Sequence, residues 1–249
     1  MKKFLRNSGW TILALLVLGL AGFLIWASTP AEPQPEALQS LNDTPEVNFE
    51  TTNGWLIFTP ANTAPATGLI LYPGGRVNPR AYAPQAQAIA AGGFKVVIVP
   101  MPLNFAFLGA NRAFQVKAGF PEIAHWSVGG HSLGGAMAAE FAKNHSQTID
   151  GLVLWASYPA ENSDLSILDI AVISIYATND GLASPEEVLS AQPRLPADTL
   201  FVAIPGGNHA GFGSYGAQAG DGELEIEKSE QQSQVVEATL GFFFALEEE

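Results

Sequence analysis

The sequence contains no cysteine and few basic residues, and each absence excludes a class of protein. Without cysteine, the chain has no thiol nucleophile, no disulfide framework and no thiolate metal site. There are 11 Lys and Arg residues against 24 Asp and Glu residues, which gives a formal net charge of −13 at pH 7. Nucleic-acid binding requires clustered positive charge, so we expect no nucleic-acid partner.

Charged residues as a whole are scarce, whereas apolar residues are abundant. Hydrophobic residues make up 47% of the 249 positions and charged residues 14%, a composition that excludes an intrinsically disordered chain. This length suits one folded domain with an appendage, and a domain of this size buries a core without disulfides or structural metal. We expect the folded domain over residues 46–249.

A long uncharged stretch follows the basic start of the chain. Residues 10–27 are nearly all apolar, and Lys2, Lys3 and Arg6 precede them. Basic residues ahead of an apolar run favour a cytoplasmic N-terminus and export of the chain beyond the run. We therefore predict a basic cytoplasmic segment over residues 1–9, one transmembrane anchor over residues 10–27, the membrane as a partner, and an extracytoplasmic domain. A cleaved signal peptide, which would leave the domain secreted, is the alternative.

Residues 28–45 separate this apolar run from the folded domain. They include Pro30, Pro33 and Pro35 among small and polar residues. Such a composition predicts a semi-extended, Pro-rich linker.

Beyond residue 46, short apolar runs rich in β-branched residues alternate with stretches of helical composition. This alternation predicts an α/β fold with a doubly wound, mostly parallel sheet. Most runs are continuously apolar, as expected for strands covered on both faces. The predicted strands are residues 47–51, 55–58, 68–72, 95–100, 126–129, 151–156, 170–177 and 199–204. Asn53-Gly54 between the first two predicts a hairpin. The predicted helices are residues 81–91, 111–118, 134–144, 186–192 and 227–248.

The pattern Gly130-x-Ser132-x-Gly134 lies between a predicted strand and a predicted helix. A serine on such a tight turn adopts a strained backbone, and glycines on either side avoid clashes of Cβ atoms. The turn raises the hydroxyl above the sheet, and the start of the helix supplies free N–H groups and positive potential. We predict Ser132 as a nucleophile and the amide of Leu133 as one oxyanion donor. A simple turn of the chain is the alternative for the pentapeptide alone.

A serine nucleophile needs a base and an orienting carboxylate. His209 follows the last predicted strand and Asp180 follows the one before it, so both are expected at the carboxyl edge of the sheet, as is Ser132. The order Ser132, Asp180, His209 predicts a catalytic triad. Three other candidates are expected away from that edge: His145, Asp164 and Asp169.

The second oxyanion donor is expected in the turn after the strand at residues 68–72. This turn reads Pro73-Gly74-Gly75-Arg76-Val77, and its glycines let the backbone approach a ligand closely. The amide of Gly75 and the amide of Arg76 are both candidates.

These motifs resemble those of the α/β-hydrolase superfamily over residues 47–247, in particular a bacterial, membrane-associated branch called α/β-hydrolase fold-5. The resemblance implies an α/β-hydrolase fold and esterase-like hydrolysis with Ser132 as nucleophile, Asp180 as acid and His209 as base. Tyr72-Pro73 stands where many relatives have His-Gly. The motifs that carry the resemblance are Tyr72-Pro-Gly-Gly-Arg76, Gly130-His-Ser-Leu-Gly-Gly135 and Gly207-Asn-His-Ala210.

From these residues we predict a serine hydrolase that cleaves small to medium carboxylic esters through an acyl-enzyme, without metal or organic cofactor. An acyltransferase that uses the same triad and a catalytically silent, anchored binding module are the alternatives. The sequence predicts no oligomeric state.

The surroundings of the site are also predicted. The stretch between the strands at residues 151–156 and 170–177 is too short for a large cap domain. Residues 102–108 are expected to line an acyl pocket, and residues 211–216 to form a mobile wall. Asp221 and its acidic neighbours are expected on a solvated surface.

Overall fold

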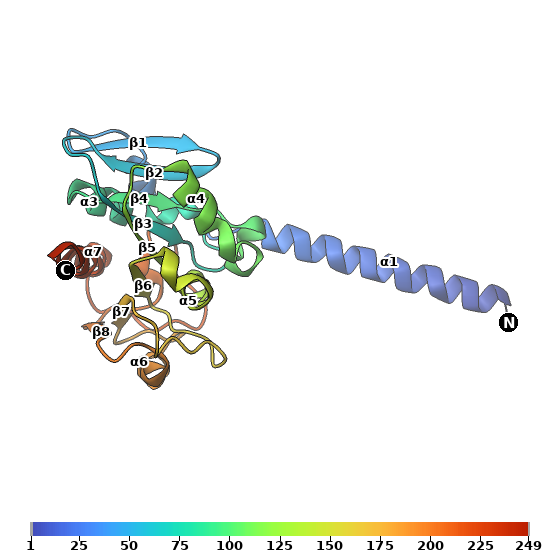
Figure 1. Ribbon diagram of the computed structural model, residues 1–249. Coiled ribbons are helices and arrows are strands. Elements are labelled where there is room, and N and C mark those ends of the chain that lie inside the picture. The colour runs from blue at the N-terminus through green and yellow to red at the C-terminus, as the bar shows by residue number, and fades with distance from the viewer. Residues whose placement is uncertain (1, 249) are drawn as a thin grey trace.

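We describe the protein from a computed structural model that covers residues 2–248; for residues 2–11 it gives only the course of a helix. One sheet has the strand order β1-β2-β4-β3-β5-β6-β7-β8 (Figure 1). β2 runs antiparallel to β1 and β4, and the remaining pairs are parallel, which confirms the predicted mostly parallel sheet. The strands are β1 Val47–Thr52, β2 Trp55–Pro60, β3 Thr67–Tyr72, β4 Lys95–Ile98, β5 His125–His131, β6 Gly151–Trp155, β7 Ala171–Ala177 and β8 Leu200–Ile204.

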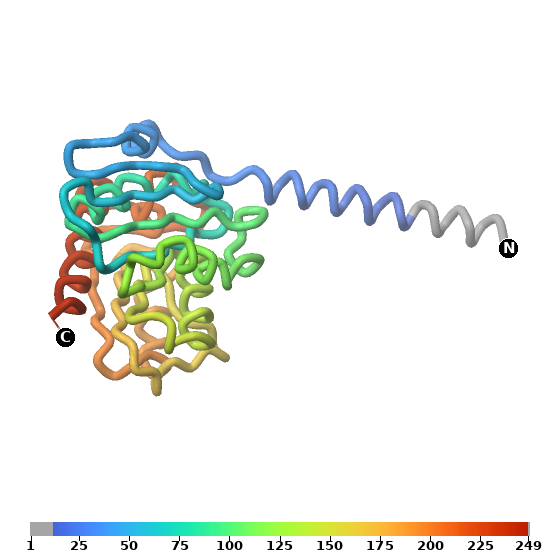
Figure 2. Tube along the Cα trace, turned by 45° about the horizontal axis from the view of Figure 1, so that its top comes forward, coloured from blue at the N-terminus to red at the C-terminus, as the bar shows by residue number. Residues whose placement is uncertain are grey.

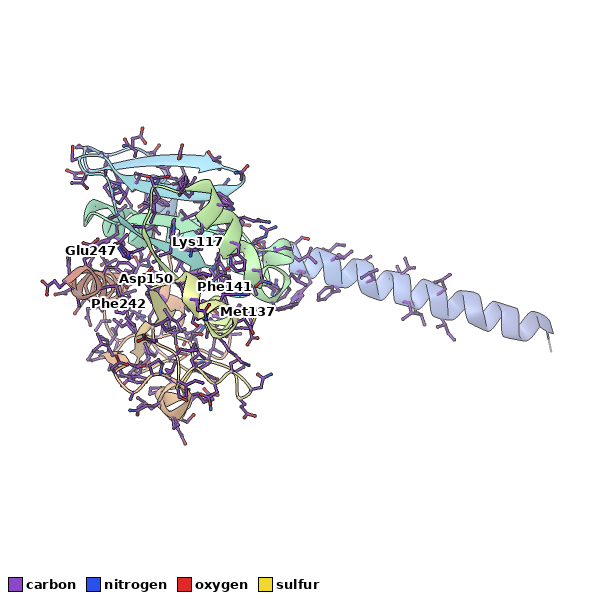
Figure 3. All side chains as sticks on the ribbon, in the orientation of Figure 1. Lys117, Met137, Phe141, Asp150, Phe242 and Glu247 are labelled. Carbon is purple, nitrogen blue, oxygen red and sulfur yellow. The ribbon has the colours of Figure 1, made fainter. Side chains whose placement is uncertain are left out.

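Helices cover both faces of this sheet, and each face has its own apolar core. α3 and α7 pack on one face, and α4 and α5 pack on the other. Figure 3 labels one buried phenylalanine from each core, Phe242 on α7 and Phe141 on α5. Cores on both faces explain why the central strands are continuously apolar. The helices are α1 Lys2–Ala27, α2 Pro35–Gln39, α3 Ala83–Ala91, α4 Ala113–Gly119, α5 Leu133–His145, α6 Pro185–Ser190 and α7 Lys228–Glu248.

Two local predictions can be compared with these elements. The predicted hairpin between β1 and β2 is confirmed, with Asn53 and Gly54 at φ values of 55° and 80°, as a tight two-residue hairpin turn requires. Between β6 and β7 the chain forms no helix, in line with the predicted lack of a large cap.

Helix α1 extends away from the body of the protein (Figures 1 and 2), and its apolar side chains from Ile12 to Trp26 are exposed. Across the part of the chain with described side chains, none of the helices is both long enough and apolar enough to span a membrane. The predicted transmembrane anchor over residues 10–27 is therefore not supported. Residues 1–9, Trp10 and Thr11 lie outside the described side chains.

The segment expected as a semi-extended linker lies against the body of the protein. Ala31 forms a parallel bridge with Val77, and Pro33 forms an antiparallel bridge with Tyr215. The short helix α2 follows and buries Ala37 completely. Residues 28–45 therefore pack as part of the domain, because their small apolar residues and backbone groups find partners at the carboxyl edge of the sheet.

We expect the centre of the sheet to be intolerant of a single methyl group. A Cβ atom on Gly129 in β5 would lie 2.6 Å from the carbonyl oxygen of Val153 in β6. Gly129→Ala should therefore lower the free energy of unfolding by about 1–3 kcal/mol in urea denaturation, as overpacking does. A Cβ atom on Gly241, on the exposed side of α7, would meet no atom within 4 Å, so this glycine provides the control. Gly241→Ala should raise the free energy of unfolding by about 1 kcal/mol, and equal effects of the two changes would contradict this packing.

Candidate active site

Ser132 lies between the end of β5 and the start of α5 in a strained backbone conformation. Its φ and ψ are 52° and −123°, a region that a residue with a side chain occupies only when its surroundings hold it there. Its N–H donates to the carbonyl of Trp155 at 3.0 Å, and its carbonyl accepts from the Ser157 hydroxyl at 2.7 Å. The end of β6 thus holds both backbone groups of Ser132 and fixes the turn.

The glycines on either side of Ser132 allow neighbouring backbone to approach closely. A Cβ atom on Gly130 would lie 2.6 Å from the carbonyl oxygen of Tyr72, and one on Gly134 would lie 2.5 Å from that of Pro73. A side chain at either position would therefore push β3 away from the turn. Ser132 Oγ has no hydrogen-bond partner within residues 12–248, His209 included.

Asp180 and His209 form a buried pair at the same edge of the sheet. His209 Nδ1 lies 2.8 Å from Asp180 Oδ2, and the two side chains are 1% and 0% exposed. Asp180 Oδ1 accepts the N–H groups of Leu182 and Ala183 at 2.8 and 2.7 Å, which fixes the carboxylate. A carboxylate only accepts, so Nδ1 of His209 carries the proton and Nε2 is left as the acceptor.

His131, the residue before Ser132, brings this pair close to the turn. The ring centroids of His131 and His209 are 4.5 Å apart. Burial first, and the neighbouring His209 second, hold the pKa of His131 well below its usual value, so the His131 ring is neutral. The structure therefore brings Ser132, Asp180 and His209 to one edge of the sheet.

The other candidates lie elsewhere. His145 ends α5 and packs against the rings of Phe114 and Phe141, at centroid distances of 4.7 and 4.9 Å. Asp164 is on the surface and accepts the N–H of Ser166. Asp169 precedes β7, at the edge opposite to Asp180.

The turn after β3 presents one free amide next to Leu133. The N–H of Arg76 donates to the carbonyl of Asn104 at 2.8 Å, which removes it as an oxyanion donor. The N–H of Gly75 has no partner among residues 12–248, and a Cβ atom on Gly75 would lie 3.2 Å from Leu133 Cδ2. Leu133 is the first residue of α5, where N–H groups precede the helical ladder. Of the two candidates for the second donor, the geometry leaves Gly75.

A chain of hydrogen bonds links this turn to the residue before Ser132. The N–H of Gly74 donates to the Tyr82 hydroxyl at 3.0 Å, and that hydroxyl lies 2.9 Å from Nδ1 of His131. Burial raises the pKa of Tyr82, so its hydroxyl keeps its proton and donates to His131. Nothing in the local sequence around Tyr82 indicates this role.

The loop that carries His209 is held by polar side chains that no sequence motif identifies. Asp221 Oδ1 accepts the N–H of His209 at 3.0 Å, and Oδ2 accepts that of Ala210 at 2.8 Å. Gln231 on α7, completely buried, accepts the N–H of Asn208 at 3.0 Å and donates to its carbonyl at 2.7 Å. The acidic neighbours Glu223, Glu225 and Glu227 are exposed, as predicted for a solvated surface, whereas Asp221 is half-buried and its carboxylate is occupied by backbone N–H groups.

The cavity next to Ser132 is small and lined mainly by small side chains. Its volume is about 320 Å³. Residues 102–108 do not line it; they form short 3-10 turns, Phe107 is 54% exposed, and Phe105 lines a separate cavity that Gly75 also borders. Residues 211–215 are buried, so the predicted mobile wall is instead part of the core. The cavity is lined by Ser132, Leu133, Ala136, Ala156, Ser157, Tyr158, Ala160, Leu182 and Ala183.

Within residues 12–248 no group of three or more His, Asp or Glu side chains converges as a metal site would require. The polar groups at this edge of the sheet are instead a serine, a histidine–carboxylate pair and free amides. Such groups are able to support nucleophilic chemistry at a carbonyl carbon.

Comparisons with known proteins agree with this architecture. The crystal structure of the esterase domain from a Rhodothermus marinus protein is similar in fold, with a TM-score of 0.56 and 14% sequence identity. The alignment covers 78% of this chain and 95% of that one. A comparison with curated proteins found no match. A family model described as the alpha/beta hydrolase family matches residues 68–233. With more than half of its length matched, the chain belongs to the alpha/beta hydrolase family.

Proposed function

We propose that this protein is a serine hydrolase that cleaves small to medium carboxylic esters through an acyl-enzyme. The observation that carries the proposal is the strained Ser132 at the same edge of the sheet as the buried Asp180–His209 pair, whose Nδ1–Oδ2 distance is 2.8 Å. A backbone strained in this way persists only where its surroundings hold it, and such strain is concentrated at functional sites. Family membership and the fold shared with an esterase domain support the same reaction class.

In the proposed reaction, Ser132 Oγ attacks the ester carbonyl while Nε2 of His209 accepts its proton. Asp180 holds the imidazole in the tautomer that makes this transfer possible and stabilises the imidazolium that results. His209 then protonates the departing alcohol, and water hydrolyses the acyl-enzyme with the same groups. A positioned base of this kind contributes roughly 10²–10⁴ to the rate.

The negative charge on the carbonyl oxygen needs donors that point at it. The N–H groups of Leu133 and Gly75 belong to two adjacent turns, after β5 and after β3, and are the donors we propose. Each donor of this kind contributes about 10²–10³ to the rate, because it is oriented before the charge develops.

The cavity supports the proposed substrate size. Its volume of about 320 Å³ lies at the lower end of the range for ligand sites. Four of its lining residues are alanines, so it provides apolar contact and few polar groups. Esters with a short or medium apolar chain fit such a space.

Labelling with a fluorophosphonate tests the nucleophile. We expect the full chain to be labelled and Ser132→Ala to be unlabelled, since the phosphonate reacts with an activated serine. His209→Ala should be labelled about 10²–10⁴ times more slowly, because the base is lost. His145→Ala, a histidine outside the site, is the matched control and should react like the wild type. No labelling of a folded wild type would contradict the proposed function.

A second prediction concerns Asp221, which positions His209 without facing the substrate. Asp221→Ala leaves the N–H groups of His209 and Ala210 without their acceptor, so the imidazole should lose its alignment. A displacement of about 1 Å costs up to about 10²-fold in rate, so we expect kcat for a short-chain p-nitrophenyl ester to fall by about 10–100-fold with little change in KM. Asp164→Ala, at an exposed aspartate, is the control. Equal kcat values for the two variants would contradict a positioning role.

We also propose that residues 1–27 direct the hydrolase domain out of the cytoplasm. The proposal is supported by Lys2, Lys3 and Arg6 ahead of an apolar run and by the exposed apolar side chains of α1. In a bacterial host, the ester hydrolase activity should be found outside the cytoplasm, and intact mass measurement should show whether residues 1–27 are retained. A change of the three basic residues to glutamate should reduce export. If the wild type and the variant with three glutamates stay in the cytoplasm to the same extent, the proposal is contradicted.

A further inference from the structure

The turn that carries Gly75 is bound by residues 26–34, which we call the N-terminal strap. Arg76 contacts the strap through its side chain: Nε donates to the carbonyl of Trp26 at 3.1 Å, and a terminal nitrogen donates to that of Thr29 at 2.8 Å. The guanidinium carbon also lies 4.0 Å from the centroid of the Trp26 ring, which is a cation–π distance. These contacts occupy the guanidinium, so Arg76 is bound to the protein and not directed at a substrate.

The backbone of the turn is bound to the strap as well. The N–H of Ala31 donates to the carbonyl of Arg76 at 2.7 Å, and its carbonyl accepts the N–H of Asn78 at 3.0 Å. Arg76 itself has a φ of 55°, a left-handed conformation that costs free energy for a residue with a side chain. The strap therefore forms an extra strand-like pairing at the point where the turn is strained.

Asn104 also connects the strap to the turn, in addition to the Arg76 side chain and the backbone of Ala31. Its carbonyl accepts the N–H of Arg76 at 2.8 Å, while its side-chain amide donates to the carbonyl of Ala27 at 2.8 Å. This arrangement occupies the N–H of Arg76, while the preceding N–H, that of Gly75, has no partner among residues 12–248. The identity of the free amide thus depends on contacts that include the strap.

Strap and turn also enclose a second cavity of about 460 Å³. Thr29, Pro30 and Ala31 line one side of it, and Gly75 and Arg76 line the other. Gly75 borders this cavity, and Leu133 borders the one next to Ser132.

We propose that the N-terminal strap is a working part of the active site and that Arg76 is a positioning residue, which holds the Gly75 amide in place for the oxyanion. This role rests on the proposed function, in which Gly75 is an oxyanion donor. A purely structural strap would close the edge of the domain and affect stability alone. Loss of a positioning residue weakens the stabilisation of the transition state and lowers kcat in folded protein. Loss of a purely structural contact leaves kcat of the folded protein unchanged.

The test uses the full chain with Arg76→Gln, which removes the charge and the paired donation to Trp26 and Thr29. Arg80→Gln is the matched control, because Arg80 is exposed and belongs to the segment that follows the same turn. We expect kcat of Arg76→Gln for a short-chain p-nitrophenyl ester to fall about 10–100-fold, with KM within about threefold, as for partial loss of one oxyanion donor. Arg76→Lys keeps the charge without the planar fork, so its kcat should lie between the kcat values of Arg76→Gln and Arg80→Gln.

A second readout is specific to the oxyanion. Replacement of the carbonyl oxygen of the ester by sulfur weakens the hydrogen bonds from the oxyanion donors, so the wild type should hydrolyse the thionoester much more slowly. We define the thionoester penalty as the ratio of the rate for the ester to the rate for the thionoester. In Arg76→Gln this ratio should be smaller than in the wild type, because the Gly75 donor is already misplaced. Asn104→Gly, which keeps the left-handed backbone and the carbonyl but loses the amide that binds Ala27, should show a smaller shift in the same direction.

The outcomes separate the two proposals. Measurements are made well below each variant's thermal midpoint, so that only folded protein is compared. Arg76→Gln with the kcat of Arg80→Gln, or with a lower kcat and an unchanged thionoester penalty, would overturn the positioning role and leave the serine hydrolase in place. A folded wild type that neither reacts with a fluorophosphonate nor hydrolyses an ester would overturn both.

Discussion

The strained backbone of Ser132 is the constraint on which the rest of the site depends. It persists because three central strands end beside it: Ser132 follows β5 directly, Trp155 at the end of β6 and Ser157 beyond it bond its N–H and carbonyl, and the end of β3 lies against its neighbouring glycines. These strands are buried on both faces, so the strain is balanced by the best-packed part of the molecule. A loop could not hold a serine in this conformation.

The histidine side of the site is held differently. His209 lies on an irregular loop whose backbone groups are bound by side chains rather than by a sheet ladder. Asp221 and Gln231 accept N–H groups of that loop, and Gln231 projects from α7. The last helix therefore both covers one face of the sheet and positions the proposed base. A buried polar contact of this kind is costly to break, because its partners are left unsatisfied.

The features predictable from the sequence are those set by neighbouring residues. Continuous apolar runs predicted the strands, Asn53-Gly54 predicted the hairpin, and the glycines around Ser132 predicted the turn. Each depends on local sterics or on burial of a short segment. The order of strands then placed the three proposed triad residues at one edge.

The features that were missed depend on contacts between distant segments. Asp221 resembles any acidic surface residue until the His209 loop folds over it. The choice between Gly75 and Arg76 depends on the carbonyl of Asn104. Residues 28–45 have the composition of a free linker, yet their backbone bridges to Val77 and Tyr215 and the burial of Ala37 hold them against the domain. Their partners lie tens of residues away, so no local pattern encodes them.

Docking of the strap also determines how far the active site is able to move relative to α1. A free, flexible linker of 18 residues has a root-mean-square reach of about 20–25 Å, which would let the domain tumble independently of the helix. Since the strap is hydrogen-bonded to the turn after β3, the segment between α1 and the domain is instead held, and α1 leaves the body of the protein directly from it (Figure 1). A displacement of the end of α1 would therefore act on the turn that carries Gly75, through the contacts between Trp26 and Arg76.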